Sequence, residues 1–412
     1  MPVYQGNNMP KVKKQNEEAI RAAIYRYGPV SRSSLALLLA LTPPTITTNV
    51  QALIGEGLVR ELPAEAAQPG SMGRRPIDID FIPDAAYALG CEPGPYHTGL
   101  CLTDLRGRVV GEQVWEPAGA DCGELVRELS RRVDDLVRNS RISQKKILGL
   151  GIGVPGFLDG DGTILRSGIH AGWNGYPLAR DVAEAVGMPV VAENNVHVRA
   201  VREVMDTTRD RADSFAYFYV SRGIGCTLMA RSGLLTGEIT GAGEAGHMVM
   251  ERGGEICPTC GNNGCLEAYA SDRAIGRKCA ALAGTEAGAV LRRLCRNPEA
   301  PTVEEALAAQ AAGVPGVDEI LRTAVEYLGI ALANIINFIS PAQVLVDSAL
   351  MQSEANRRLM RETVSRNLLA SDMLEVGLEF IEADALGGAK GAAALAIREY
   401  LIHNSRRDSA VK

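Results

Sequence analysis

Three cysteines and one histidine form the strongest candidate chemical site in this chain of 412 residues. His247 is followed in one short segment by Cys257, Cys260 and Cys265. Three thiolates and one imidazole complete the tetrahedral coordination of a structural zinc ion and leave no open position for a catalytic water. The segment therefore predicts a structural zinc site with these four ligands.

Two other interpretations of the same cysteines are a redox Cys-x-x-Cys pair and a set of buried thiols. Neither requires the third cysteine or the histidine, so we favour zinc. The chain has nine cysteines in total, an odd number, and carries no export signal. A disulfide framework is therefore not expected.

A second candidate site is an uncharged polar helix face near the N-terminus. Proline in the first turn and Ile46, Val50 and Leu53 at helical spacing predict a helix over 43–56 that buries one face. The outward face is short, mostly polar and uncharged, and is therefore suited to DNA bases. It holds Pro44, Thr45, Thr48 and Gln51, with Thr47 and Asn49 on its flanks.

The elements around this helix predict a winged helix-turn-helix. Two helices are expected before it, over 16–27 and after Ser31, with Ser31 and Thr42 as caps of the second and third helices. Strand-like runs over 57–62 and 77–81 follow.

The loop between those two strands carries Arg74 and Arg75 at the tip of the predicted wing. In such domains the third helix enters the DNA major groove, and wing arginines reach phosphates or a narrow minor groove. The alternative, a small helical protein-interaction domain, accounts less well for the polar face and the paired arginines.

Composition and charge limit the class of protein. Hydrophobic residues make up 46% of the chain and charged residues 22%, as in a globular protein of about three units. The net charge is -6, yet residues 1–80 hold nine Lys and Arg against seven Asp and Glu, so an anionic partner is expected only there. No apolar run is long enough to cross a membrane, and we expect a cytoplasmic protein without membrane contact.

From Tyr87 onward, strand-like runs alternate with helical runs, which indicates the α/β class. Glycine-rich segments, among them 149–156 and 387–391, are expected to form turns of the kind that cradle ligands. The apolar stripe on the predicted helix over 325–339 is either core or subunit interface, with core favoured.

In this order the motifs resemble the ROK family of sugar kinases and sugar-responsive repressors, including repressors that respond to N-acetylglucosamine, glucose or xylose. The resemblance covers nearly the whole chain. It implies a two-lobed, actin-like kinase domain behind the winged helix-turn-helix. The stretches that carry it are Gly153-Val-Pro-Gly156, Ala171-Gly-Trp173, Glu193-Asn194-Asn195, Gly243-Glu-Ala-Gly-His247 and the cysteine segment through Glu267. This chain has Cys-x-x-Cys where family members commonly have Cys-x-Cys.

The resemblance also implies which residues hold a sugar. Positions that bind sugar hydroxyls in the family match Asn194, Asn195, Glu244, His247 and Glu267 here. Carboxylates and amides suit sugars because each can pair with two hydroxyls. Zinc bound through one ring nitrogen of His247 would fix the direction of the other. The alternative is that these polar residues only cap turns.

The kinase signatures of the family have changed in this chain. The family's catalytic base, an aspartate, matches Asn195, whose amide cannot take a proton. The first phosphate loop matches Glu92-Pro93-Gly94-Pro95-Tyr96, where a proline removes an amide donor. The second matches Ser221-Arg222-Gly223, and the late Gly-Gly matches Asp347-Ser348. We therefore expect neither catalysis nor ATP binding.

Together these observations predict a transcriptional regulator, most simply a repressor of carbohydrate genes. A sugar bound between the lobes is expected to release it from a double-stranded operator. The predicted domains are 1–82 for DNA binding, 83–195 with 385–412 for the smaller lobe, and 196–384 for the larger lobe with zinc. The family implies a homodimer or homotetramer. The alternatives are an active sugar kinase with an added DNA-binding domain and a regulator that answers to a protein partner.

Overall fold

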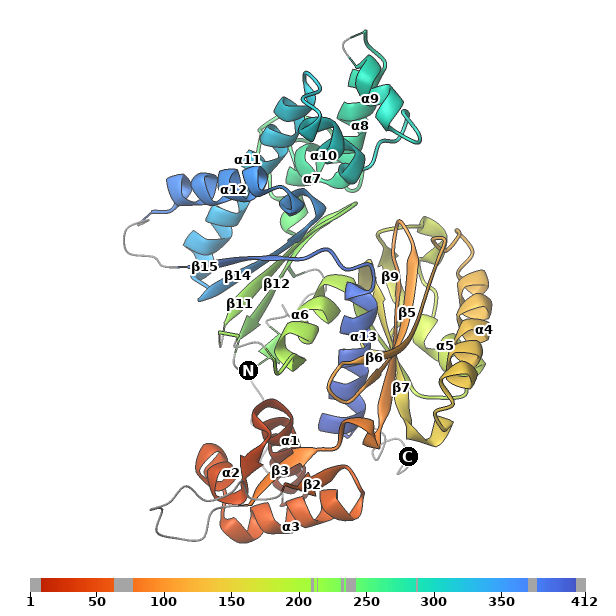
Figure 1. The fold of residues 1–412 in the computed structure, drawn as a ribbon, viewed down its shortest axis with the longest axis vertical. Coiled ribbons are helices and arrows are strands. Elements are labelled where there is room, and N and C mark those ends of the chain that lie inside the picture. Colours follow the sequence, from red (N-terminus) through yellow and green to blue (C-terminus); the bar gives the residue numbers. More distant parts are fainter. Residues whose placement is uncertain are drawn as a thin grey trace, which may run out of the picture. The chain divides into compact units, whose positions relative to one another are not determined.

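Three helices and a small antiparallel sheet form the N-terminal part of the structure, a computed structural model (Figure 1). The structure describes residues 9–62, 77–208, 211–212, 214–230, 233–234, 242–286, 288–369 and 376–404. The elements are α1 (Met9–Tyr27), α2 (Arg32–Leu39) and α3 (Pro43–Gly55), with a sheet in the order β1 (Val30–Ser31), β3 (Asp78–Phe81), β2 (Val59–Glu61). The predicted helices and strands are present, and β1 adds a third strand.

The helix starts follow local capping chemistry in one case and not in the other. The Ser31 side chain accepts a hydrogen bond from the Ser34 backbone amide at 3.0 Å, which confirms the predicted cap of α2. The prediction that Thr42 caps α3 is wrong, because its hydroxyl pairs with the Thr45 hydroxyl instead. A cap side chain accepts from the backbone amide at N2 or N3, and Pro44 at N2 has no such amide.

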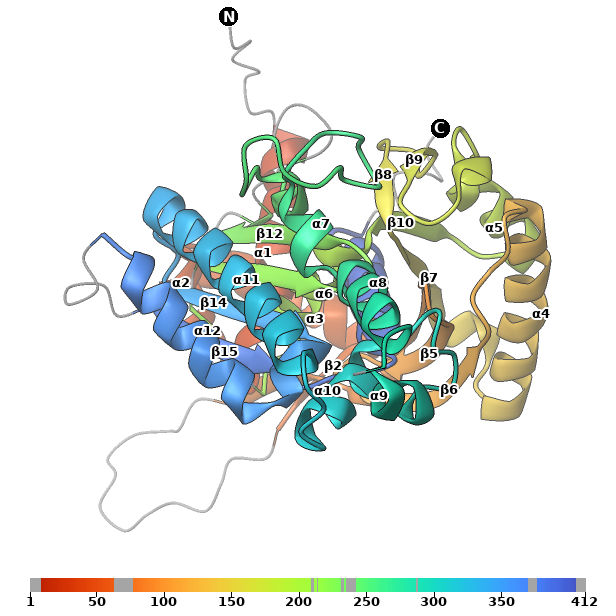
Figure 2. The same ribbon diagram turned by 90° about the horizontal axis from the view of Figure 1, so that it is seen from above.

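A five-stranded sheet follows in the order β10 (Val190–Asn194), β7 (Ile147–Val154), β4 (Tyr87–Pro93), β5 (Thr98–Asp104), β6 (Val109–Trp115). Strands β4, β5 and β6 are antiparallel, while β4, β7 and β10 are parallel. A small hairpin, β8 (Gly156–Leu158) and β9 (Ile164–Ser167), lies outside this sheet. Helices α4 (Cys122–Ser140) and α5 (Leu178–Val186) pack on one face, as Figure 2 shows.

The other face of this sheet is covered by α6 (Asn195–Met205) and α13 (Gly387–Ile397), which continues as η6 (Arg398–Ile402). Glycines at alternate positions of β7 allow these two helices to lie directly against the sheet. A Cβ on Gly151 would lie 1.9 Å from the Ala392 carbonyl oxygen, and one on Gly153 would lie 2.7 Å from Val198. The expectation of a ligand-binding turn over 149–156 is therefore wrong for Gly149–Gly153, which lie in a strand under two helices.

The second sheet has the order β13 (Gly233–Leu234), β12 (Ile224–Ala230), β11 (Phe215–Val220), β14 (Gln343–Ser348), β15 (Gly377–Ile381). Its helices are α7 (Leu266–Ala270), α8 (Asp272–Ala283), α9 (Ala289–Leu294), α10 (Val303–Ala311), α11 (Val317–Ile339) and α12 (Glu354–Asn367). Helices α11 and α12 cover one face (Figure 1). Leu328, Leu332 and Ile336 of α11 are buried, which confirms the core interpretation.

Both sheets have the same topology: three antiparallel strands followed by two strands parallel to the first. The chain divides into two units, Met1–Asp210 with Gly388–Lys412, and Arg211–Gly387. The sequence placed the division at 195 and 385. The unit boundary lies later because α6 packs on the first sheet. Among the described residues, no helix is long and apolar enough to span a bilayer.

Candidate metal centre and ligand-binding residues

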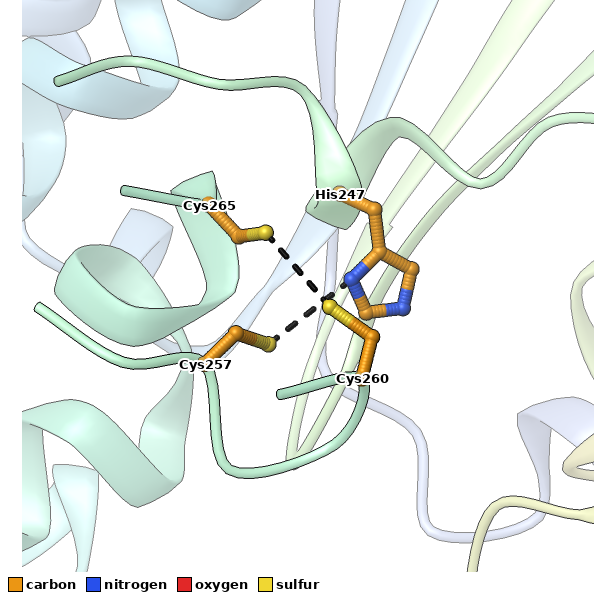
Figure 3. Close-up of side chains that lie close together, drawn as sticks. All are labelled: His247, Cys257, Cys260 and Cys265. Atoms are coloured by element: carbon orange, nitrogen blue, oxygen red, sulfur yellow. Dashed lines mark hydrogen bonds between the residues drawn. The ribbon is translucent and has the colours of Figure 1, made fainter. Parts of the chain in front are cut away.

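The four predicted metal ligands come together in the second unit. Their ligand atoms all lie within 4.8 Å of one another, and Figure 3 shows the side chains pointing toward a common centre. Cys257 Sγ lies 3.7 Å from His247 Nδ1, and Cys260 Sγ lies 3.6 Å from Cys265 Sγ. Four ligands around zinc, with Zn–S bonds of about 2.3 Å, would lie about 3.8 Å apart. The donor set and its spacing therefore fit a tetrahedral zinc ion.

Burial keeps two of these thiols protonated unless a cation binds beside them. Cys257 and Cys265 are buried, and burial raises the pKa of the Cys265 thiol to about 12. A buried thiolate needs a compensating positive charge, which a bound zinc ion supplies by displacing the proton.

The loop that carries the cysteines is held by turns and by two tyrosines. Gly261 and Gly264 both have φ of +79°, and a Cβ on Gly264 would lie 1.7 Å from the Glu251 carbonyl oxygen, so glycine is required there. The Tyr269 hydroxyl donates to Glu251 Oε2 at 2.9 Å and accepts from the Glu255 amide at 2.7 Å. Its ring stacks on Tyr327 at 4.8 Å. These contacts anchor the loop to α7 and α11.

Three of the predicted sugar ligands gather beside this loop. Nδ1 of His247 faces the cysteines, and Nε2 lies 4.0 Å from Glu244 Oε2. Glu267, in the first turn of α7, is buried, and its Oε1 accepts a hydrogen bond from the Thr259 hydroxyl. A Cβ on Gly246 would lie 3.3 Å from Glu267 Oε2, so that carboxylate lies close to the turn η4 (Ala245–His247). Sequence reasoning missed Thr259, whose only signal is its place between two cysteines.

The other two predicted sugar ligands lie in the first unit, where β10 passes into α6. Asn194 caps α6: its Oδ1 accepts from the Val196 and His197 amides at 2.8 and 3.3 Å, and its Nδ2 donates to the Gly156 carbonyl at 2.9 Å. Asn195 is buried and donates from Nδ2 to Glu92 Oε1 at 3.3 Å. The amide of Asn194 is thus largely used by the backbone, as the capping alternative expects.

Glu92 ends β4 at the position that resembles the first phosphate loop. Arg199 of α6 donates to Glu92 Oε2 at 2.7 Å, and both side chains are buried. A Cβ on Gly388 would lie 1.9 Å from the same oxygen, so α13 starts directly against the carboxylate. Sequence reasoning did not identify Arg199. Its signal was a cation within the largely apolar stretch Val196–Val201.

The face of α3 that was predicted to read DNA is accessible to solvent. Pro44, Thr47, Thr48 and Gln51 are exposed. Thr45 and Asn49 are half-buried, and Asn49 Nδ2 donates to the Thr45 carbonyl at 2.9 Å. On the opposite side Ile46, Val50 and Leu53 are buried, as predicted. Arg74 and Arg75 lie outside the described residues.

Comparisons with known proteins agree with this architecture. The model of the ROK family matches residues 88–399. The xylose repressor of Bacillus subtilis is 27% identical over 343 residues, which are 83% of this chain and 84% of that protein.

Among solved structures, a ROK family transcriptional regulator described as a homolog of the Escherichia coli MLC protein superposes with a TM-score of 0.78 at 22% identity. The match covers 95% of this chain and 98% of that one. A ROK family glucokinase from Streptomyces griseus, in complex with glucose and AMPPNP, superposes with a TM-score of 0.66 at 23% identity, over 75% of this chain and 99% of that one. These likenesses confirm the predicted α/β, actin-like fold.

Proposed function

The chain belongs to the ROK family, and on this premise we propose that it is a sugar-responsive transcriptional repressor. The observation that carries the proposal is the exposed, uncharged polar face of α3, presented by a three-helix domain ahead of the ROK region. The glucokinase that superposes on this chain is covered to 99% by a match over 75% of the chain, so the kinase fold is complete without such a domain. The similarity to a xylose repressor over most of both chains supports the same conclusion.

The N-terminal domain, residues 1–82, binds the operator as a winged helix-turn-helix. Helix α3 enters the major groove and reads bases with the face that holds Thr47, Thr48 and Gln51. The flanking positions Pro44, Thr45 and Asn49 shape the contact, and Arg74 and Arg75 contact the backbone. A homodimer or homotetramer would present two such helices to the two halves of a palindromic operator.

The effector is a sugar held by Glu244, His247 and Glu267. Zinc bound by His247 Nδ1 and the three cysteines is structural: it orients the imidazole so that Nε2 faces the sugar beside Glu244. Asn195 and the second Nδ2 hydrogen of Asn194, both in the first unit, are two further proposed donors to sugar hydroxyls. Sugar binding shifts the chain toward a state with lower operator affinity.

Catalysis is not part of the proposed function. The position of the family's catalytic base holds an amide, and Asn195 donates to Glu92 rather than accepting a proton. Glu92 is in turn neutralised by Arg199 within the protein, so a nucleotide-bound cation would have to compete with a buried guanidinium. The second candidate function is an active sugar kinase, favoured only by the fold shared with the glucokinase.

In vitro selection of genomic DNA fragments on the purified, zinc-loaded protein tests the proposal. The bound fragments are sequenced and retested for release by D-xylose, D-glucose and N-acetylglucosamine. We expect enrichment of a palindrome and release by one sugar. Failure to enrich any fragment with folded protein would contradict DNA binding, and ATP-dependent phosphorylation of any of the sugars would favour the kinase.

A further inference from the structure

Arg21 connects the two ends of the first unit. It lies on α1, its side chain is buried, and its Nη1 donates to the backbone carbonyl of Leu401 at 2.9 Å, 380 residues away in the sequence. Its Nη2 lies 3.6 Å from Glu56 Oε2. One guanidinium therefore contacts the C-terminal segment and the end of α3 at the same time.

Glu56 is the C-cap residue of α3. A carboxylate at the C-terminus of a helix lies at the negative end of the helix dipole, which disfavours it. The guanidinium of Arg21 offsets this repulsion. Displacing Arg21 would thus destabilise the last turn of α3, the helix that we propose to read the operator.

Leu401 lies on η6, a π-helical turn that continues α13 without a break. Inserted π turns in α-helices are frequent at functional positions. Helix α13 starts where the chain returns from the second unit, between Gly387 and Gly388. It packs backbone against backbone on the first sheet: a Cβ on Gly90 would lie 2.0 Å from the Ala389 carbonyl oxygen. So close a fit leaves α13 little freedom against the first sheet, so α13 and η6 move together with that sheet.

The contact between α1 and η6 combines charged and apolar side chains and is only partly filled. A groove of about 380 Å³ lies there, lined among others by Lys13, Glu17, Arg21 and Ile402, and Leu401 and Ile402 are buried. Beside it His403 Nδ1 lies 3.8 Å from Glu18 Oε2. An interface that leaves a groove of this size unfilled lacks part of the dispersion energy of a fully packed core, so a second arrangement costs less there.

We infer that Arg21 is the coupling residue through which the position of α13 and η6 is transmitted to α3, so that effector binding changes operator affinity. The inference rests on the proposed function for its signal, which is the binding of a sugar effector. The bridge itself rests on the geometry: because Arg21 uses two different nitrogens for two partners, it transmits a displacement of Leu401 to Glu56. A lysine has a single nitrogen and cannot hold both partners in this way.

The test compares the full-length variants Arg21→Met, Arg21→Lys and, as a control, Arg26→Met. Arg26 is an exposed cation on the same helix and lies outside the residues that line the groove. The first measurement is operator affinity without and with D-xylose, D-glucose or N-acetylglucosamine, together with the affinity of each variant for the sugar alone. We expect both Arg21 variants to bind sugar like the wild type, and the sugar-induced change in operator affinity to fall about tenfold. The Arg26 variant should respond like the wild type.

The second measurement needs no sugar. Hydrogen exchange of the wild type and variants follows backbone amides at the end of α3, in η6 and in the strands β4 and β7. We expect about tenfold less protection at the end of α3 in both Arg21 variants, with β4 and β7 unchanged.

Full coupling in Arg21→Lys would overturn the bridging role, since charge alone would then suffice. Unchanged protection from hydrogen exchange at the end of α3 in both Arg21 variants would overturn the inference, whatever their operator affinity. If no sugar shifts the wild type while the exchange result is as expected, the proposed sugar response fails and the mechanical link stands.

Discussion

Arg199 donates a 2.7 Å hydrogen bond to Glu92 from the neighbouring helix, and both side chains are buried. Removing one member of a buried ion pair leaves a charge without compensation, at a cost of about 3–5 kcal/mol. We expect Arg199→Met and Glu92→Gln each to lower the free energy of unfolding by about 3 kcal/mol, measured by urea denaturation. The double variant should lose less than the sum of the two. Strictly additive losses would mean that the two side chains do not stabilise each other.

Restoring a carboxylate at position 195 should not restore a kinase. In Asn195→Asp the new carboxylate faces Glu92, whose Oε1 is 3.3 Å from the present amide nitrogen. Burial and the like charge raise the pKa of the new carboxyl above its ordinary value of about 3.9. The folded state then binds more protons than the unfolded chain, so stability falls as the pH rises.

Urea denaturation at pH 5 and pH 7 tests whether the stability of the variant falls as the pH rises. The variant should lose more stability at pH 7, relative to the wild type, and an ATP-coupled assay with D-xylose and D-glucose should show no turnover. Phosphorylation by this variant would show that the phosphate loops still function.

The metal prediction concerns Cys260, a half-buried ligand whose thiol lies 3.6 Å from that of Cys265. Cys260→Ser should bind no zinc by elemental analysis, because serine is a poor zinc ligand. The sugar response should disappear with the metal, since His247 and Glu267 flank the same loop. Cys295→Ser is the matched control, a buried cysteine outside the cluster. Full zinc occupancy in Cys260→Ser would place the metal elsewhere.

Local chemistry made several parts of this structure predictable. The Ser31 cap, the buried face of α3 and the clustering of His247 with three cysteines each follow from spacing along one short segment. The strand β7 was misread as a turn because its alternating glycines fit two interpretations. Only the helices packed against Gly151 and Gly153 decide between them.

Long-range polar interactions could not be predicted in the same way. Arg199 and Glu92 are separated by 107 residues, and Arg21 and Leu401 by 380. No periodicity links residues so far apart, and the acceptor in the second pair is a backbone carbonyl, which any residue type supplies. Such interactions depend on which elements the topology places side by side.

A substitution at Glu244 should weaken sugar binding without changing DNA binding. This side chain lies 4.0 Å from His247 Nε2 and belongs to a unit that holds no part of the N-terminal domain. Glu244→Gln keeps the shape but weakens hydrogen bonds to hydroxyls, because a neutral acceptor is weaker than a charged one. We expect at least a tenfold loss of sugar affinity by calorimetry and unchanged operator affinity, with Glu326→Gln on α11 as control. Loss of both activities together would count against separate sites.

Different substitutions in the N-terminal domain should affect the recognition of bases and the binding of the DNA backbone. Thr48 and Gln51 are exposed on α3, so Thr48→Ala and Gln51→Ala should each relax the preference for particular bases at a cost of about 1–3 kcal/mol. The double variant Arg74→Ala with Arg75→Ala should instead weaken binding to all DNA sequences. It should also reduce the dependence of affinity on salt, by about 0.9 in the slope of log affinity against log salt concentration for each phosphate that the arginines no longer neutralise. Titrations of selected and random duplexes between low and moderate salt distinguish the two effects, with Arg138→Ala on α4 as control for the removal of positive charge. An unchanged salt slope in the double arginine variant would place the wing away from the DNA, and unchanged base preference in both α3 variants would place another element in the groove.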